Sequence, residues 1–386
     1  MAHFSPLRAL KPRPSVLTRV RATASVERSV LFFAEDSSDW LHIGPLANHL
    51  EEIGYLVLRL TADPKDPVIS NHGGLFVGRT VAAANLFLRL PPCVLVTTMT
   101  DLDTYHLKRS INDVHYVYVF HSLLSTHRAY RANAFDAYDS ILCASPNHLI
   151  ELETVANLRP RRPQTLYSTG YCRLDTLLAE TKDTEYIDRD FPRVLIAPTW
   201  GPSSLLEYDL DKIIFSLLTH DIEVVLRFHP MSVRHDARLI DEYQNRFGNN
   251  RHFSLDHTFE SSKSLIESDI VLSDWSGAAH EFSLAFLRPT VFIDTPPKAH
   301  NDVHSLLGLD CYEDAVRENL GALIALNQIE TIPNVVNILF TDRTKWQQRL
   351  LSLRNTVVFN PGNAISTAAT QLQDIILQHS DRRLLD

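Results

Sequence analysis

Short apolar runs alternate with amphipathic helical segments along most of the chain, and this alternation limits the possible folds more than any other feature. The first unit is an apolar run at 29–35 (SVLFFAE), a helical pattern at 39–54 and a second run at 55–61 (YLVLRLT). Two strands joined through a helix pair in parallel, because the crossover returns the chain to the same end of the sheet. The sequence therefore predicts an α/β fold with parallel sheets.

The same rhythm occurs twice, on either side of a polar segment at 179–192 that is rich in Asp, Glu, Lys and Thr and is interpreted as a linker. We expect residues 29–178 and 193–386 to form two doubly wound, Rossmann-type domains that face each other across a cleft. A last helix at 364–380 is expected to pack back across the seam. The other predicted strands are 93–98, 115–120, 140–145, 165–171, 193–199, 222–230, 270–274 and 289–294, and the main helices of the second half are 205–221, 238–248 and 277–287.

Composition excludes several classes of protein. A chain of 386 residues is long for one core, and its formal net charge of −9 disfavours a generally basic nucleic-acid surface. No apolar stretch is long enough to span a membrane. The cysteines lack CxxC spacing, so neither a zinc site nor a redox dithiol is indicated. They are Cys93, Cys143, Cys172 and Cys311, of which the first two lie in apolar runs and are expected to be buried.

The first 28 residues form a basic segment, because no acidic residue precedes Glu27. We expect ordered structure to begin near Ser29. Three interpretations stay open: a solvated tail, a helix or arm that touches an anionic membrane, or an organelle transit peptide. The basic residues are Arg8, Lys11, Arg13, Arg19 and Arg21.

The segment 273–282 (SDWSGAAHEF) carries the strongest functional signal. It follows a predicted strand and starts a predicted helix near Ser276 or Gly277. The free N–H groups and positive dipole end of such a helix bind anions such as a diphosphate. Glu281 follows one turn later, where its carboxylate is able to accept hydrogen bonds from ribose hydroxyls. The alternative is an ordinary serine cap before a helix with an exposed glutamate.

Two histidines end other predicted strands. His229 lies in RFHP (227–230), where it is suited to bind a phosphate oxygen while Arg227 neutralises charge. His121 lies in VFHS (119–122) of the first half, where it would face the cleft as a base for an alcohol. Ligands of open α/β sheets bind at these strand ends, although a lone histidine there is often structural.

Two further motifs flank the proposed site. APTWG (197–201) ends the first strand of the second half, so Thr199 is able to meet a phosphate and Trp200 to stack or to pack in the core. STGYCRLD (168–175) contains Gly170 and Arg173, and its alternative reading is a turn with an Arg–Asp surface pair. By contrast, the chain has no P-loop, GxSxG, HExxH or EF-hand pattern, and no GxGxxG follows the first strand.

Taken in order, these motifs resemble the CDP-glycerol glycerophosphotransferase family of teichoic-acid and capsule polymerase-like enzymes. In that family a strand leads into S-D-[YW]-S-[SG], followed by an acidic residue and by [KR]-P before the next apolar strand. The resemblance covers roughly residues 115–295 and includes the upstream PTW, HP and G-x-x-R-x-D elements. The matching residues are Gly170, Arg173, Asp175, Pro198, Thr199, Trp200, His229, Pro230, Ser273, Asp274, Trp275, Ser276, Gly277, Glu281, Arg288 and Pro289.

The resemblance implies a GT-B fold and transfer of glycerol phosphate from CDP-glycerol to a hydroxyl, with release of CMP. Residues 29–178 would hold the acceptor and residues 193–386 the CDP donor. His121 would be the general base and His229 a phosphate ligand. Ser276, Gly277 and Thr199 would hold the diphosphate, and Glu281 the ribose. Arg227, Ser273 and Asp274 complete the expected donor site, and further candidates are Ser122, Arg128, Arg173 and Trp200.

One departure concerns the acceptor side, because the family usually shows W-H-G-x-x-x-K where this chain has FHSLLSTHR at 120–128. Two other functions stay open: a GT-B glycosyltransferase that uses a nucleotide sugar for capsule or lipopolysaccharide, and a non-catalytic nucleotide-binding scaffold. No metal ligands are expected, and Mg²⁺ is an open alternative as cofactor. Expected partners are a CDP-activated donor, a polysaccharide or lipid-linked acceptor and, through residues 1–26, an anionic membrane, but no nucleic acid. This implies a cytoplasmic protein, with peripheral attachment to the inner face of the cell membrane as the alternative.

Overall fold

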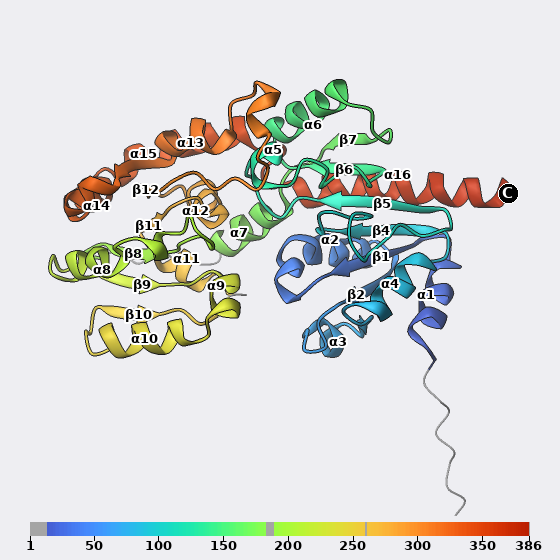
Figure 1. The fold of residues 1–386 in the computed structure, drawn as a ribbon, viewed down its shortest axis with the longest axis horizontal. Coiled ribbons are helices and arrows are strands. Elements are labelled where there is room, and N and C mark those ends of the chain that lie inside the picture. The colour runs from blue at the N-terminus through green and yellow to red at the C-terminus, as the bar shows by residue number, and fades with distance from the viewer. Residues whose placement is uncertain (1–13, 183–188, 259–260, 386) are drawn as a thin grey trace, which may run out of the picture.

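The computed structural model describes residues 14–182, 189–258 and 261–385. These residues form two parallel sheets, each covered by helices on both faces, that lie side by side (Figure 1). The strand order is β3-β2-β1-β4-β5-β6-β7 in the first sheet and β10-β9-β8-β11-β12-β13 in the second. The predicted α/β class with two doubly wound sheets is therefore confirmed.

The first half begins earlier than predicted, because a helix over 16–24 precedes the first strand and buries Val20 and Ala24. Residues 1–13 of the expected tail lie outside the described residues. Its strands are β1 (Ser29–Ala34), β2 (Leu56–Thr61), β3 (Leu75–Phe76), β4 (Cys93–Thr97), β5 (Val114–Val119), β6 (Ser140–Cys143) and β7 (Thr165–Ser168). Its helices are α1 (Val16–Ala24), η1 (Ser37–Asp39), α2 (Trp40–Glu52), α3 (Val68–Asn71), α4 (Val81–Leu88), α5 (Thr126–Ala129), α6 (Pro146–Leu158) and α7 (Cys172–Lys182).

The second half repeats the pattern after the expected linker, of which residues 183–188 lie outside the described residues. Its strands are β8 (Arg193–Ile196), β9 (Glu223–Leu226), β10 (Phe253–Leu255), β11 (Ile270–Ser273), β12 (Thr290–Asp294) and β13 (Gly321–Ala325). Its helices are η2 (Leu205–Glu207), α8 (Leu210–Leu218), α9 (Pro230–His235), α10 (Arg238–Phe247), α11 (Lys263–Glu267), α12 (Gly277–Phe286), η3 (His304–Leu307), α13 (Tyr312–Leu320), η4 (Leu326–Thr331), α14 (Ile332–Thr341), α15 (Arg343–Val357) and α16 (Ala364–Leu385).

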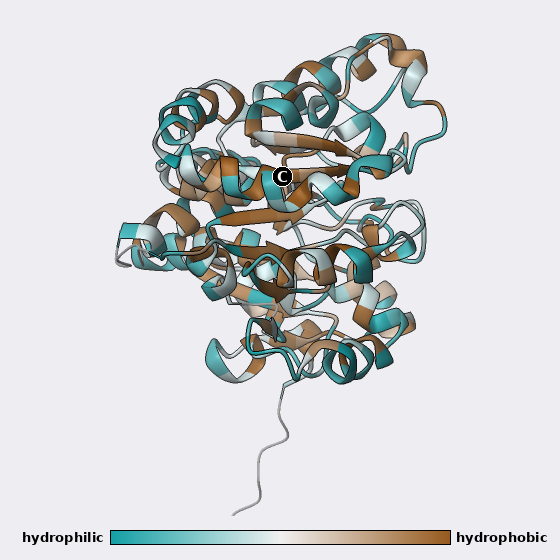
Figure 2. Ribbon diagram, turned by 90° about the vertical axis from the view of Figure 1, so that its left-hand side faces the viewer, coloured by the Kyte–Doolittle hydropathy of each residue, from teal (hydrophilic) through white to brown (hydrophobic). Residues whose placement is uncertain are grey.

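Central strands are apolar on both faces, as parallel sheets require (Figure 2). In the first sheet, Leu31 of β1 lies opposite Leu58 of β2 and Leu95 of β4, and all three side chains are buried. One apolar cluster continues from this sheet through Tyr171 and Phe282 into the second sheet. The two halves therefore share a core as well as a cleft.

Three strands at the edges of the sheets were not predicted: β3, β10 and β13. The predicted helix at 205–221 is divided, because η2 ends at Glu207 and α8 begins at Leu210. β3 and β10, with two and three residues, offer too few alternating positions for a sequence pattern to reveal them. Neither difference changes the strands that border the cleft.

The last helix, α16, lies beside the first half although it belongs to the end of the chain (Figure 1). It packs against α2 and β4, and Ala368 and Leu372 are buried there. Asp175 of α7 fixes its start, since its carboxylate accepts N–H groups from Gly362 and Ile365 at 2.7 and 3.0 Å. The chain thus crosses between the halves twice.

Candidate active site

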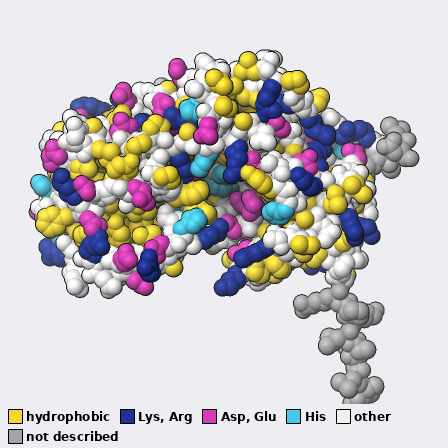
Figure 3. Space-filling model, viewed as in Figure 1, with side chains coloured by type: hydrophobic (Ala, Val, Ile, Leu, Met, Phe, Trp, Pro, Cys, Tyr) yellow, Lys and Arg dark blue, Asp and Glu magenta, His cyan; other side chains and the backbone are white. Residues whose placement is uncertain are grey.

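A cavity of about 400 Å³ lies between the two halves (Figure 3). It borders the ends of β1, β5, β8, β9 and β11. In each sheet the strand order reverses between β1 and β4 or between β8 and β11, and ligands of such sheets bind at that reversal. Ten of the thirteen predicted site residues line the cavity: His121, Ser122, Arg173, Thr199, Trp200, Arg227, His229, Ser276, Gly277 and Glu281.

Helix α12 points its first turn into this cavity. Ser276 is its N-cap residue, yet the Ser276 side chain makes no capping hydrogen bond. Because the cap hydroxyl and the first N–H groups are not used within the helix, they are available to an anion. The space beside Gly277 is shared with Ser122 of the other half, since a Cβ on Gly277 would lie 3.2 Å from Ser122 Oγ. The two halves meet here.

Ser273 and Asp274 do not line the cavity, although they belong to the same motif. The Ser273 hydroxyl donates to the Ala197 carbonyl at 2.5 Å. The Asp274 carboxylate accepts N–H groups from Thr199, Leu205 and Trp275 at 2.8, 2.7 and 2.6 Å. Both side chains are fully buried, and burial raises the pKa of Asp274 to about 6. These two residues fix the loop after β8 through hydrogen bonds to its backbone, so their effect on a ligand would be indirect.

His229 combines a structural and a ligand-facing role. Its Nδ1 accepts the Met231 N–H at 3.1 Å and caps α9. The neutral ring then carries its proton on Nε2. Burial lowers the pKa of His229 to about 4, with smaller contributions from Lys298 and Arg227, so the ring is neutral at pH 7. It therefore offers an N–H donor to a phosphate oxygen.

His121 follows β5 on the opposite wall. Its Nδ1 lies 3.2 Å from the Tyr118 hydroxyl, which fixes the orientation of the ring. Burial lowers the pKa of His121 to about 4, against a smaller rise from a hydrogen bond to the Thr98 backbone. A neutral imidazole is the form that is able to accept a proton.

Glu281 lies on α12 and is bound by Tyr171, the residue just before α7. The Tyr171 hydroxyl donates to Glu281 Oε1 at 2.5 Å. Burial raises the pKa of Glu281, and the nearby cations Arg173 and Arg227 oppose that rise. One carboxylate oxygen thus has a protein partner, which leaves the other for a hydroxyl ligand.

The motif 168–175 has no Arg–Asp surface pair, so that alternative was wrong. Arg173 is buried and donates to Ser262 Oγ at 2.8 Å, while Asp175 caps α16. Gly170 has a φ of +107°, and a Cβ there would lie 2.3 Å from the Phe359 carbonyl oxygen, so the position requires glycine.

Arg128 is the third predicted residue outside the cavity. Its guanidinium pairs with Glu313 at 3.0 Å and with Asp314 at 2.7 Å, and it lies 4.9 Å over the Trp275 ring. These contacts join α5 to α13 across the seam. Because Glu313 and Asp314 compensate the charge of its guanidinium, Arg128 fixes the position of the two halves relative to each other and does not act on a ligand.

Sequence reasoning missed His42 and Lys298, which both line the cavity. His42 lies in the first turn of α2, and its Nδ1 is 3.3 Å from the Tyr171 hydroxyl. Burial lowers the pKa of His42 well below its usual range. Its place in the first helix after β1 was a usable signal, since strand ends border the site, whereas nothing in the sequence around Lys298 indicates a ligand contact.

Within the described ranges, no group of three or more His, Cys, Asp or Glu side chains has an arrangement that would hold a metal ion. The four cysteines are buried, and none of them forms a disulfide with another described residue. None of the described helices has both the length and the apolar composition needed to cross a bilayer.

Comparison with known proteins places these features in a family context. A family model described as CDP-glycerol:poly(glycerophosphate) glycerophosphotransferase matches residues 107–363, more than half of the chain. No curated protein sequence matches the chain.

Solved structures with the same fold include two kinds of enzyme. The wall teichoic acid polymerase TagF is 14% identical, with 95% of this chain and 93% of that chain covered and a TM-score of 0.60. A putative UDP-N-acetylglucosamine 2-epimerase from Listeria monocytogenes is 13% identical, with 92% and 97% covered and a TM-score of 0.61. The UDP-GlcNAc 2-epimerase from Neisseria meningitidis is 12% identical, with 90% and 100% covered and a TM-score of 0.55. At these identities the likeness extends to the fold alone.

Proposed function

The chain belongs to the CDP-glycerol:poly(glycerophosphate) glycerophosphotransferase family, and we propose that the cavity between its halves is the site of the transfer. It is therefore a transferase that moves glycerol phosphate from CDP-glycerol to a polymer acceptor. One observation carries the proposal. His121 of the first half and His229 of the second border the same cavity, together with the start of α12.

On the donor side, the diphosphate lies against the first turn of α12, with hydrogen bonds from Ser276, Thr199 and His229. The N–H groups of the helix start and the neutral Nε2–H of His229 supply donors without a buried counter-charge. The free oxygen of Glu281 accepts ribose hydroxyls, and Arg227 and Arg173 balance the charge at that end. Such fixed donors stabilise the charge that shifts to CMP as it leaves.

On the acceptor side, His121 takes the proton of the attacking hydroxyl. The acceptor oxygen bonds to the β-phosphorus, and the bond from that phosphorus to the bridging oxygen breaks, with its electron pair leaving on CMP. The Tyr118 hydroxyl keeps the His121 ring in place during the transfer. Ser122 lies next to Gly277 and closes the gap between the two substrates.

A donor screen tests the proposal. Purified protein is supplied with CDP-glycerol, CDP-ribitol, UDP-GlcNAc and UDP-glucose, each with a glycerophosphate oligomer as acceptor, and nucleotide release is measured. We expect CMP from CDP-glycerol and no nucleotide from the UDP sugars. Turnover of a UDP sugar alone would overturn the proposal and favour a glycosyltransferase.

The acceptor belongs to the cell envelope in this proposal, as a teichoic-acid-like or capsule polymer or its lipid-linked precursor, and residues 1–13 attach the chain to the inner face of an anionic membrane. Their three basic residues Arg8, Lys11 and Arg13 support the attachment. One face of helix α1 is not available to a membrane, because Val20 and Ala24 are buried against the sheet. Sedimentation with phosphatidylglycerol vesicles should fall when residues 1–13 are deleted, and unchanged sedimentation would remove the membrane contact.

A further inference from the structure

Lys298 lies in the loop after β12 and reaches back to the loop after β8. Its Nζ is 4.4 Å from the centroid of the Trp200 ring and 3.3 Å from Thr199 Oγ1. The Trp200 ring also lies 6.1–6.2 Å from the rings of His229, His235 and His300. A cation–π contact therefore holds the ammonium at the wall of the cavity, which Lys298, Trp200 and His229 line together.

No carboxylate of the described residues lies within 4.0 Å of this ammonium. Asp274 is the carboxylate that interacts with it through space, but the two Asp274 oxygens already accept three backbone N–H groups. Burial lowers the pKa of Lys298 to about 8, so the amine is still largely charged at pH 7. A desolvated cation that faces a cavity and has no carboxylate beside it is suited to an anionic ligand.

Glu281, Arg173 and Arg227 line the cavity, as do His229, Lys298 and His300. Arg173 and Arg227 oppose the rise that burial causes in the pKa of Glu281. The His229 ring lies 6.2 Å from the Trp200 ring that Lys298 contacts, and His229 follows Arg227 by two residues after β9. If the ribose is bound at Glu281, the diphosphate passes His229 and its distal phosphate reaches Lys298.

We propose that Lys298 is a catalytic residue that contacts the β-phosphate of the donor, the phosphate that is transferred with glycerol. This rests on the proposed function. The ammonium neutralises a non-bridging oxygen of the β-phosphate while the acceptor oxygen bonds to phosphorus and the bridging oxygen leaves with CMP. Trp200 and Thr199 fix the amine before the donor arrives, so little reorganisation is needed.

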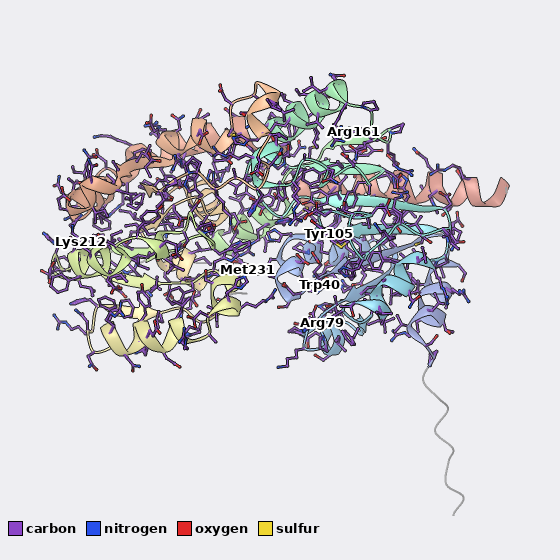
Figure 4. All side chains as sticks on the ribbon, viewed as in Figure 1. Trp40, Arg79, Tyr105, Arg161, Lys212 and Met231 are labelled. Carbon is purple, nitrogen blue, oxygen red and sulfur yellow. The ribbon has the colours of Figure 1, made fainter. Side chains whose placement is uncertain are left out.

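Binding of two nucleotides that differ by one phosphate tests the contact. Calorimetry is performed with CMP and with CDP on the full chain, on Lys298→Met and on Lys212→Met, whose lysine lies on α8 far from the cavity (Figure 4). Losing a charged hydrogen bond is expected to weaken CDP binding by about 10- to 100-fold in Lys298→Met, with CMP binding changed less than about threefold. Equal losses for CMP and CDP, or no loss for either, would overturn the contact.

The pH profile separates a charge role from a packing role. In kcat/KM for CDP-glycerol, the full chain should lose activity as the pH rises through about 8, because the free amine deprotonates there. Lys298→Arg keeps the charge and should keep activity at high pH, whereas Lys298→Met should have a low kcat at all pH values. The same alkaline decrease in Lys298→Arg would overturn the assignment. A variant is taken as folded if its melting temperature equals that of Lys212→Met. If Lys298→Met is not folded, Lys298→Gln is used in its place.

Failure of the proposed function is distinguishable from failure of this inference. If the full chain releases no CMP from CDP-glycerol, while CDP binding still depends on Lys298, the reaction is wrong and the phosphate contact stands. If the full chain turns over CDP-glycerol and Lys298→Met retains its kcat, the role of Lys298 is wrong and the reaction stands.

Discussion

The hydroxyl of Tyr171 donates a 2.5 Å hydrogen bond to Glu281 Oε1 and thereby links the segment just before α7 to α12 beside the cavity. The same hydroxyl lies 3.3 Å from His42 Nδ1 and 3.1 Å from the His121 carbonyl oxygen. The Tyr171 side chain thus contacts both Glu281, which is expected to bind the ribose, and His121, which is the expected base.

Removal of this hydroxyl should therefore affect stability and donor affinity together. In Tyr171→Phe, the buried Glu281 loses its donor, so the free energy of unfolding should fall by about 1–3 kcal/mol. The KM for CDP-glycerol should also rise. Urea unfolding and steady-state kinetics measure both effects. Tyr208→Phe is the control, because the structure gives its hydroxyl no hydrogen bond, and equal behaviour of the two variants would contradict the link.

Replacement of the expected base should abolish chemistry and spare the fold. His121→Gln keeps a polar side chain but accepts no proton, so kcat should fall by about 10²- to 10⁴-fold. CMP release from CDP-glycerol is the measurement, with the melting temperature as a check on folding. His220→Gln, at the exposed end of α8, should keep full activity. A His121→Gln enzyme with near-normal kcat would exclude His121 as the base.

The close approach of Ser122 to Gly277 can be tested by a double-mutant cycle. A methyl group in Gly277→Ala meets Ser122 Oγ at 3.2 Å, so Ser122 or the start of α12 must shift by a few tenths of an ångström, and kcat/KM should fall on the order of tenfold. Ser122→Ala removes that oxygen, and the double variant should recover much of the loss. If both changes are additive, the contact does not control the distance between the substrates.

The three N–H groups held by Asp274 predict a structural role for this carboxylate. An amide in Asp274→Asn has one acceptor oxygen, so at least one buried N–H is left without a partner. The free energy of unfolding should fall by about 1–3 kcal/mol. Denaturant unfolding measures this, with Asp209→Asn as control because Asp209 makes no capping bond to α8. A stable Asp274→Asn protein with lost donor binding would instead indicate direct contact with the donor.

The pH dependence of stability should show the ion pair between His127 and Glu151. Burial would lower the pKa of His127, but Cys311 and Glu151, whose Oε1 is 3.3 Å from Nδ1, raise it to about 10. A raised folded-state pKa gives stability that is fully present below the unfolded value of 6.5 and is lost as the pH rises to about 10. In His127→Gln, unfolding free energies should be lower at pH 6 and should change less between pH 6.5 and 10. An unchanged slope would show that His127 is neutral in the folded chain.

Most of the cavity lining from the second half was predictable, because its residues follow strands whose apolar pattern is local. Ser276, Thr199 and His229 each lie within four residues of a strand end, and parallel strands bring such ends to one edge. The prediction treated all residues of 273–277 alike, however. Only the packing separates Ser273 and Asp274, which hold the loop after β8, from Ser276 and Gly277, which border the cavity.

The sequence by itself determined the two α/β halves, the strand ends that carry the site, and the family to which the motifs are similar. Local alternation of apolar and polar residues is enough for this, since strands and helices bury their faces in fixed periods. Only the tertiary structure decided which charges remain free. Arg128 and Lys298 are both cations near the cleft, but Arg128 is neutralised by Glu313 and Asp314 from α13, whereas Lys298 has an aromatic ring and a hydroxyl beside it. Those partners lie far away along the chain, so no local pattern contains them.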